Sequence, residues 1–293
     1  MSFKEIKLSN GAFKGCAKYN YKKLPPFITE IPVNAFNGCK SITEIEIPSS
    51  VTKIGANAFN GCRQLKSLII SKNVTEIGAN AFGECTNLEN ITIEGPIRKI
   101  EDYTFYGCGS LEKIDIPKTV ESIGYQALMG CKRLKELVIP ESVTSIGKQA
   151  FKNCMKLTKI ELNCKIEIID YELFNNCEGL EEINLPKTVK IIGTSAFYCC
   201  KNLKKISFSD DLTNINDCAF YSCGTFDELS LPNKLKEIGS FAFANCTDLG
   251  QINIPESVEI IKQNAFSRSK IKSFSCSKKL ETSNIGLDKK FRK

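Results

Sequence analysis

Cysteine is the residue type in this chain with the greatest potential for chemistry. The chain has 293 residues, fifteen of them cysteine and none of them histidine. Eleven of the cysteines recur at intervals of 23: Cys16, Cys39, Cys62, Cys85, Cys108, Cys131, Cys154, Cys177, Cys200, Cys223 and Cys246. A zinc site needs several ligands that converge on one point, which such regular spacing does not provide. The pattern instead predicts one small, buried, apolar thiol per repeat, with no metal and no cofactor.

Four cysteines lie outside this series: Cys164, Cys199, Cys218 and Cys276. They are candidate exposed thiols. A reducing compartment suits a chain with so many unpaired thiols better than an oxidising one.

The chain carries no catalytic signature. Without histidine, Ser-His-Asp and Cys-His arrangements are excluded, and no glycine-rich phosphate loop occurs. Carboxylate pairs such as Glu44 and Glu46 recur with the repeat and therefore describe a surface. We expect neither an enzyme nor a small-molecule substrate.

A 23-residue repeat must position all these residues. The phenylalanine three residues before each cysteine recurs from Phe13 to Phe266, with Leu128 in one of its twelve positions. Each A-F-x-x-C-x-x-L segment spaces apolar residues by three, as a short helix does, and each I-x-I segment alternates as a strand does. One repeat cannot bury these residues alone, so neighbouring repeats must stack. The prediction is an α/β repeat solenoid with a parallel sheet of short strands on the concave face and short helical turns outside.

Proline and glycine punctuate the repeat, and the two ends depart from it. Proline ends many of the strands, and the glycine of I-G is expected to allow a tight corner. We expect an N-terminal capping unit over residues 1–35, repeats over 36–265 and a divergent cap with a basic tail over 266–293. The last repeat runs one residue out of register at Ile271, where stacking is expected to stop. A poorly capped end would favour a homo-oligomer.

The repeat reads I-G-x-x-A-F-x-x-C-x-x-L-x-x-I-x-I-P-x-x-V, which resembles the BspA-like (Treponema-type) leucine-rich repeat over roughly residues 12–270. This resemblance implies a leucine-rich-repeat arc that acts as a protein-interaction scaffold, and many members of the family resemble surface or secreted adhesins. The asparagine of the common leucine-rich signature is largely replaced by hydroxyls, as at Ser50, Thr119 and Ser142.

The outward positions of the I-x-I strands are the candidate binding face. They mix both signs of charge with two apolar residues, which suits a protein partner better than nucleic acid. The candidates are Glu44, Glu46, Ile69, Lys113, Asp115, Glu136, Val138, Lys159, Glu161, Glu182 and Lys205. The net charge of +7 arises at the two ends of the chain, so we expect no sequence-specific nucleic-acid binding along the body.

Two short motifs suggest further roles. Lys205-Ile206-Ser207-Phe208 is similar to a docking motif for type-1 protein phosphatases, although Ile206 and Phe208 fall at inward strand positions. The tail residues Lys289, Lys290, Arg292 and Lys293 resemble a nuclear-import signal, with a solubilising or membrane-attracted tail as the alternative.

These features favour an intracellular, non-enzymatic interaction scaffold in the cytoplasm and nucleus. One alternative is a cell-surface adhesin for host or matrix proteins, exported by an unconventional route. A second is a regulator of a protein phosphatase in the nucleus and cytoplasm. The N-terminal residues lack the apolar stretch of a secretory signal, and no stretch has the length of a membrane span.

Overall fold

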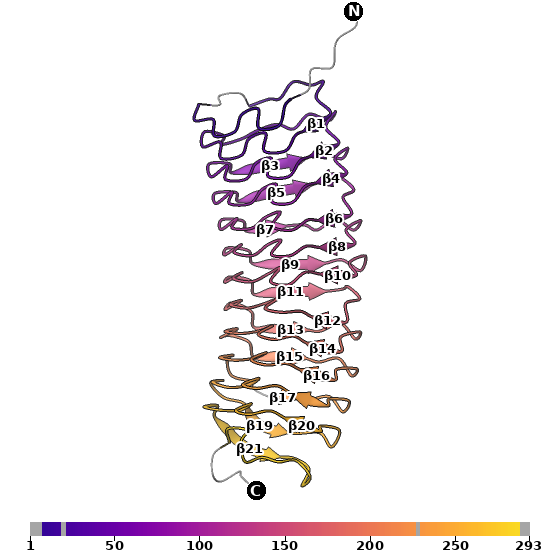
Figure 1. Ribbon diagram of the computed structural model, residues 1–293, viewed down its shortest axis with the longest axis vertical. Coiled ribbons are helices and arrows are strands. Elements are labelled where there is room, and N and C mark those ends of the chain that lie inside the picture. Colours follow the sequence, from indigo (N-terminus) through magenta and orange to yellow (C-terminus); the bar gives the residue numbers. More distant parts are fainter. Residues whose placement is uncertain (1–7, 19–21, 227–228, 288–293) are drawn as a thin grey trace, which may run out of the picture. The chain divides into compact units, whose positions relative to one another are not determined.

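The computed structural model describes residues 8–18, 22–226 and 229–287. The chain divides into two compact units, Met1–Phe151 and Lys152–Lys293. In each unit, every 23-residue repeat forms one turn of a solenoid, and most turns carry two short strands (Figure 1). We call the side formed by the I-x-I strands side A, and the side formed by the strands that follow the next corner side B.

The strands of both sides are short. In the N-terminal unit, side A consists of β3 (Ser67–Ile70), β5 (Asn90–Ile93), β7 (Lys113–Ile114) and β9 (Glu136–Ile139). Its side B consists of β1 (Glu30–Ile31), β2 (Lys53–Ile54), β4 (Glu76–Ile77), β6 (Lys99–Ile100), β8 (Ser122–Ile123) and β10 (Ser145–Ile146). In the C-terminal unit, side A consists of β11 (Lys159–Leu162), β13 (Glu182–Asn184), β15 (Lys205–Ser207), β17 (Leu229–Ser230), β19 (Gly250–Asn253) and β21 (Ile271–Ser275). Its side B consists of β12 (Ile168–Ile169), β14 (Ile191–Ile192), β16 (Asn214–Ile215), β18 (Glu237–Ile238) and β20 (Ile260–Ile261).

The paired strands within each unit are parallel, and almost all register partners lie one repeat apart. Leu68 of β3 faces Ile91 of β5, and Ile191 of β14 faces Asn214 of β16. The predicted stop at Ile271 is wrong, because β21 still pairs with β19 through a register shift between Gly250 and Gln251. Lys272 is the extra residue at this shift, and beyond it Ile252 pairs with Phe274 and Asn253 with Ser275, so the ladder continues into the last repeat.

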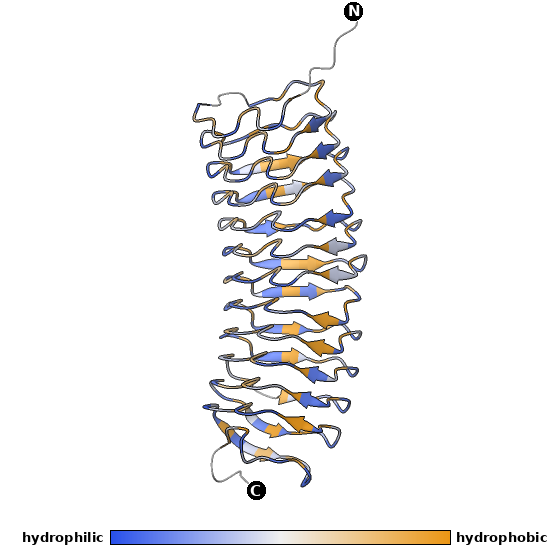
Figure 2. Ribbon diagram, in the orientation of Figure 1, coloured by the Kyte–Doolittle hydropathy of each residue, from blue (hydrophilic) through white to orange (hydrophobic). Residues whose placement is uncertain are grey.

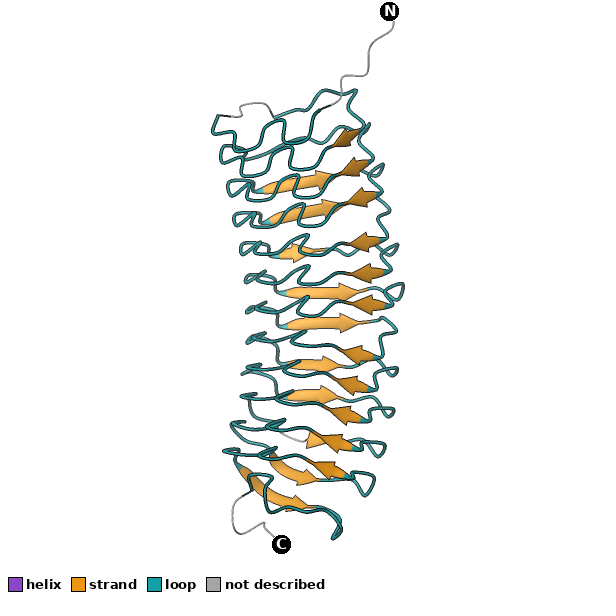
Figure 3. Ribbon diagram, in the orientation of Figure 1, coloured by secondary structure: helices purple, strands orange, loops and turns teal. Residues whose placement is uncertain are grey.

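The predicted short helical turns are wrong. No helix occurs in the described part of the chain, and the A-F-x-x-C segments are consecutive turns (Figure 3). In one such segment Asn34 and Gly38 have φ values of 58° and 68°, which are left-handed and would end a helix. The amide N–H of Phe36 donates to the carbonyl oxygen of Ala58 in the next turn at 2.7 Å, rather than to its own segment. Turns of three residues give apolar residues the same spacing as a helix face.

The expectation of a single sheet is also incomplete. The x-I-G segments form the strands of side B, so the repeat is a two-sided β-solenoid with its core between the two sides. The core contains the inward isoleucines of both sides together with the phenylalanine series from Phe36 and the cysteine series from Cys39. The rings of Phe36 and Phe59 stack with centroids 5.1 Å apart and planes 5° from parallel. Neighbouring turns therefore cover each other's apolar edges, as stacking requires.

The glycine of I-G is required for a different reason from the predicted one. Gly78 is not left-handed, but a Cβ atom there would lie 2.5 Å from the backbone nitrogen of Ala56 in the preceding turn. A Cβ atom at Gly55 would likewise lie 2.6 Å from the backbone nitrogen of Val33. Close approach of two backbones, rather than a special φ, therefore excludes a side chain at this corner.

The hydroxyls that replace the asparagine form a ladder along the solenoid. Ser50 Oγ donates to the carbonyl oxygen of Ile28 at 2.6 Å, and Thr188 Oγ1 donates to that of Ile166 at 2.7 Å. Each hydroxyl thus binds a backbone acceptor of the preceding turn and helps to hold the two turns together.

Candidate functional site

The predicted face lies on side A, and all eleven of its candidate residues are exposed. On the I-x-I segments they alternate with buried residues, as in β9, where Glu136 and Val138 point outward and Leu137 and Ile139 inward. Parallel pairing aligns equivalent positions of neighbouring turns, so that Glu182 lies beside Lys205. Side A therefore presents rows of side chains at the spacing of the strands.

Ion pairs neutralise much of the charge on this face. Lys113 Nζ lies 3.2 Å from an oxygen of Asp115, and Lys159 Nζ lies 2.8 Å from an oxygen of Glu161. Glu44 pairs with Lys22. Exposed pairs of this kind contribute at most about 1 kcal/mol to stability, so their effect is on what the surface attracts.

Two apolar side chains stand out from this charged background. Ile69 is 61% exposed and Val138 is 49% exposed. Ile69 also lines a hollow of about 340 Å³ together with Glu44 and Glu46. Isolated exposed aliphatics are common on protein surfaces, but here both have polar neighbours: Ile69 lies beside Thr92 of β5, and Val138 shares the outward face of β9 with Glu136.

The phosphatase-docking match faces into the solenoid. Ile206 and Phe208 are half-buried, whereas Lys205 and Ser207 are exposed. The ring of Phe208 packs edge-on against that of Phe220, with centroids 6.0 Å apart. The tail residues Lys289, Lys290, Arg292 and Lys293 lie outside the described residues.

The cysteine series forms hydrogen bonds in the core. Cys62 Sγ donates to the carbonyl oxygen of Phe36 at 3.1 Å, and Cys200 Sγ donates to that of Phe174 at 3.2 Å. Burial raises the pKa of the Cys85 and Cys108 thiols well above the ordinary value, so both stay protonated at neutral pH. In the last repeat a serine takes over the bond, and Ser269 Oγ donates to the carbonyl oxygen of Phe243 at 2.6 Å.

The prediction of an exposed thiol is wrong for one of the four cysteines outside the series. Cys164 is buried, with only 4% of its surface exposed. Cys199, Cys218 and Cys276 are half-exposed, as is Cys16 at the N-terminal end. No group of three Cys, Asp or Glu residues suited to a metal ion occurs among the described residues.

We expect the native protein to expose four reactive thiols and to protect the other eleven. Cys16, Cys199, Cys218 and Cys276 should react with a thiol reagent such as Ellman's reagent, and the buried cysteines should react only after unfolding. Because burial also raises the pKa of Cys199 and Cys218, their thiolate fraction and hence their rate should increase as the pH rises above neutral. Rapid reaction of all fifteen in the native protein would contradict the buried series.

The outward residues of side B were not anticipated from the sequence. In the N-terminal unit this row includes Lys53, Glu76 and Lys99, and in the C-terminal unit it includes Ile168 and Ile191. The corresponding strands β12 and β14 are coloured as hydrophobic in Figure 2. The available signal was the pair formed by the inward isoleucine of each repeat and the outward residue directly before it, which is the alternation of a two-residue strand.

Two-sided stacking of parallel strands at a 23-residue period defines a repeat protein of the leucine-rich class. The model of the BspA type leucine rich repeat region matches residues 6–132, 98–226 and 167–286. The chain belongs to this family. Leucine-rich repeats of this family are in general non-enzymatic scaffolds for protein interaction. The part of the chain described contains no helix that could span a membrane.

Solved structures of bacterial leucine-rich repeat proteins share this fold. A leucine-rich repeat protein from Bacteroides ovatus is 27% identical, with a TM-score of 0.62, over 78% of this chain and 77% of its own. One from Eubacterium ventriosum is 22% identical, with a TM-score of 0.52, over 96% and 84%. The pneumococcal vaccine antigen PcpA is 21% identical, with a TM-score of 0.53, over 92% and 66%. No curated protein matches the chain.

Proposed function

We propose that this chain is an interaction scaffold that binds a protein partner through side A. The observation that supports the proposal is the in-register row of exposed, mixed-charge side chains around Ile69 and Val138. Aliphatic residues within a polar rim are the usual composition of a protein-binding surface. The buried thiols and the hydroxyl ladder hold neighbouring turns together, and neither belongs to the outward rows.

The test compares two side A variants with a matched variant on side B. Ile69→Asp and Val138→Asp should each reduce retention of a co-purifying protein from native cell lysate by about tenfold or more, because a carboxylate would be desolvated at the contact. Ile260→Asp changes a residue of similar exposure, 51%, on side B and should leave retention unchanged. Equal retention by all three variants would place binding elsewhere, and melting temperatures would verify that each variant is folded.

We propose the cytoplasm and nucleus as the location, with residues 289–293 as the import signal. The alternative is a cell-surface adhesin that binds host or matrix proteins. A tagged protein with and without residues 289–293 separates the two, because truncation should abolish nuclear signal, whereas staining of intact cells would favour the adhesin.

A phosphatase regulator is the least supported alternative. The side chains of Ile206 and Phe208 would have to leave the solenoid to be presented to a phosphatase. Self-association through a terminal repeat also stays a prediction, and light scattering on the purified protein would measure it.

A further inference from the structure

A groove of about 1060 Å³ runs across side B of the N-terminal unit. Its lining comes from six successive turns, from Val33 at one end to Ser142 at the other. Stacked turns are about 4.8 Å apart, so the groove extends about 24 Å along the stack, the length of about seven residues of extended chain. Its volume is at the upper end of the range for binding sites.

Small residues hollow out one edge of the groove. Gly55 and Gly78 cannot carry a side chain there, because a Cβ atom would meet the backbone of the preceding turn. Each is followed by an alanine, Ala56 or Ala79, which also lines the groove. The close packing of the corners therefore leaves an apolar, backbone-lined strip that a peptide could approach closely.

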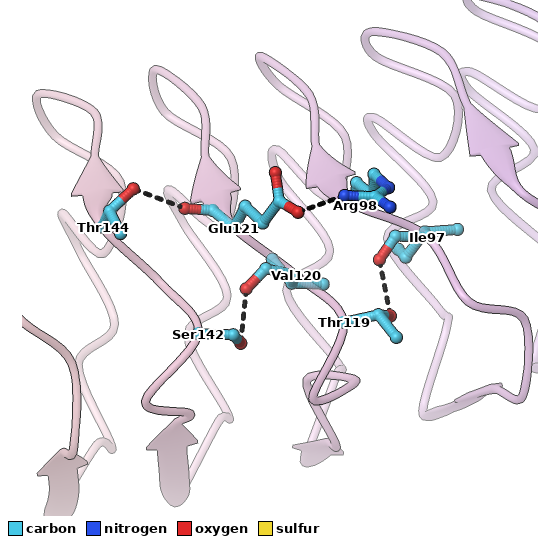
Figure 4. Close-up of polar contacts among 7 residues, drawn as sticks. All are labelled: Ile97, Arg98, Thr119, Val120, Glu121, Ser142 and Thr144. Atoms are coloured by element: carbon cyan, nitrogen blue, oxygen red, sulfur yellow. Dashed lines mark hydrogen bonds and ion pairs between the residues drawn. The ribbon is translucent and has the colours of Figure 1, made fainter.

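The opposite edge is held by hydrogen bonds between turns, as Figure 4 shows. Thr119 Oγ1 donates to the carbonyl oxygen of Ile97 at 2.8 Å, and Ser142 Oγ donates to that of Val120 at 2.7 Å. This edge is consequently ordered before any ligand arrives, which reduces the entropy that binding would cost.

The charges of the groove leave two lysines unneutralised. Lys53 pairs with Glu76 at 2.7 Å, and Arg98 pairs with Glu121 at 2.5 Å (Figure 4). Lys99 and Lys118 also line the groove, and neither forms an ion pair with any described residue. Against them stands the single carboxylate of Glu101. The lining thus has an excess of positive charge, in a chain whose basic residues are concentrated at its ends.

We propose that this groove binds an extended acidic segment of a protein partner. Carboxylates of the segment would pair with Lys99 and Lys118, and its backbone would lie along the glycine and alanine strip. A polyphosphate chain fits less well, because it would bring uninterrupted negative charge against Glu76, Glu101 and Glu121. An acidic peptide can space its charges to avoid these three carboxylates. This surface is separate from side A, so the two proposals can fail independently.

The experiment measures binding of fluorescein-labelled octapeptides to the full chain by anisotropy. One peptide alternates glutamate with alanine, and two controls replace the glutamates by glutamine or lysine. The glutamate peptide should bind at least about tenfold more tightly than either control, and its binding should weaken as ionic strength rises. Binding of the lysine or glutamine peptide with equal affinity would overturn the proposal.

Variants of the chain test whether the glutamate peptide binds in the groove. Lys99→Glu and Lys118→Glu together should abolish the preference for the glutamate peptide. Lys187 occupies the same Pro-Lys-Thr-Val context in the C-terminal unit, outside the groove, so Lys187→Glu should leave the affinity unchanged. An equal loss of affinity in this control would mean that net charge alone explains the effect, and it would overturn the proposal.

A second variant tests the small-residue strip without changing charge. Ala79→Leu would fill the strip and should also weaken binding of the glutamate peptide. Thermal melts would establish that each variant is folded. Val138→Asp should bind the glutamate peptide with unchanged affinity. A failure of the side A proposal can therefore be distinguished from a failure of the groove proposal.

Discussion

Replacement of Phe197 by alanine should lower the free energy of unfolding by about 3–5 kcal/mol, the range for a fully buried aromatic residue. The side chain is 0% exposed and lies between two other rings, with centroids 5.2 Å from that of Phe174 and 5.1 Å from that of Phe220. The turns on either side are held at fixed spacing by backbone ladders, so they cannot collapse into the cavity. The loss would therefore include both the transfer term and the full cavity term.

Chemical denaturation of the two proteins would measure this difference. Phe27→Ala is the matched control, because Phe27 is 52% exposed and its removal should cost less than about 1 kcal/mol. A similar loss for both variants would mean that the ring stack is not what stabilises the C-terminal unit. Since each repeat contacts only its neighbours, the variant should also show a broader transition.

Replacement of Gly78 by alanine should destabilise the N-terminal unit by about 3 kcal/mol or more, although it adds only one carbon. The new Cβ would lie 2.5 Å from the nitrogen and 2.8 Å from the Cα of Ala56, which are backbone atoms. Relief would require the two turns to separate, which would stretch the 2.8 Å hydrogen bond from the Gly78 N–H to the Ile54 carbonyl oxygen. Overpacking and the weakened hydrogen bond would then both contribute to the loss in the free energy of unfolding.

Gly109→Ala provides the control for this substitution. The nearest atom to a Cβ at Gly109 is 4.0 Å away, and the residue has no left-handed φ. Its replacement should change stability by less than about 1 kcal/mol in either direction. If Gly78→Ala and Gly109→Ala melted at the same temperature, the close approach of the corners would not limit the choice of residue.

Much of the candidate surface could be predicted from the sequence, but its electrostatics could not. Alternation in the I-x-I segments correctly indicated that Glu136 and Val138 point outward between buried residues. The pairing of Arg98 with Glu121 was not predictable, since it joins residues 23 positions apart on a side that was expected to have no strands. Cys164 was placed wrongly because it lies outside the 23-residue series, so the period does not indicate whether it points inward, and it is buried.

The 23-residue period by itself determined the solenoid, the family and the inward series of phenylalanine, cysteine and isoleucine. An exact repeat can bury its apolar residues in only one general way, by stacking on copies of itself. Only the tertiary structure decided between helix and turn in the A-F-x-x-C segments, and only it revealed side B and its groove. An apolar residue at every third position fits both a helix and a series of turns. What separates them is whether the Phe36 N–H bonds within its own segment or to Ala58 in the next turn, and that contact exists only once the turns are stacked.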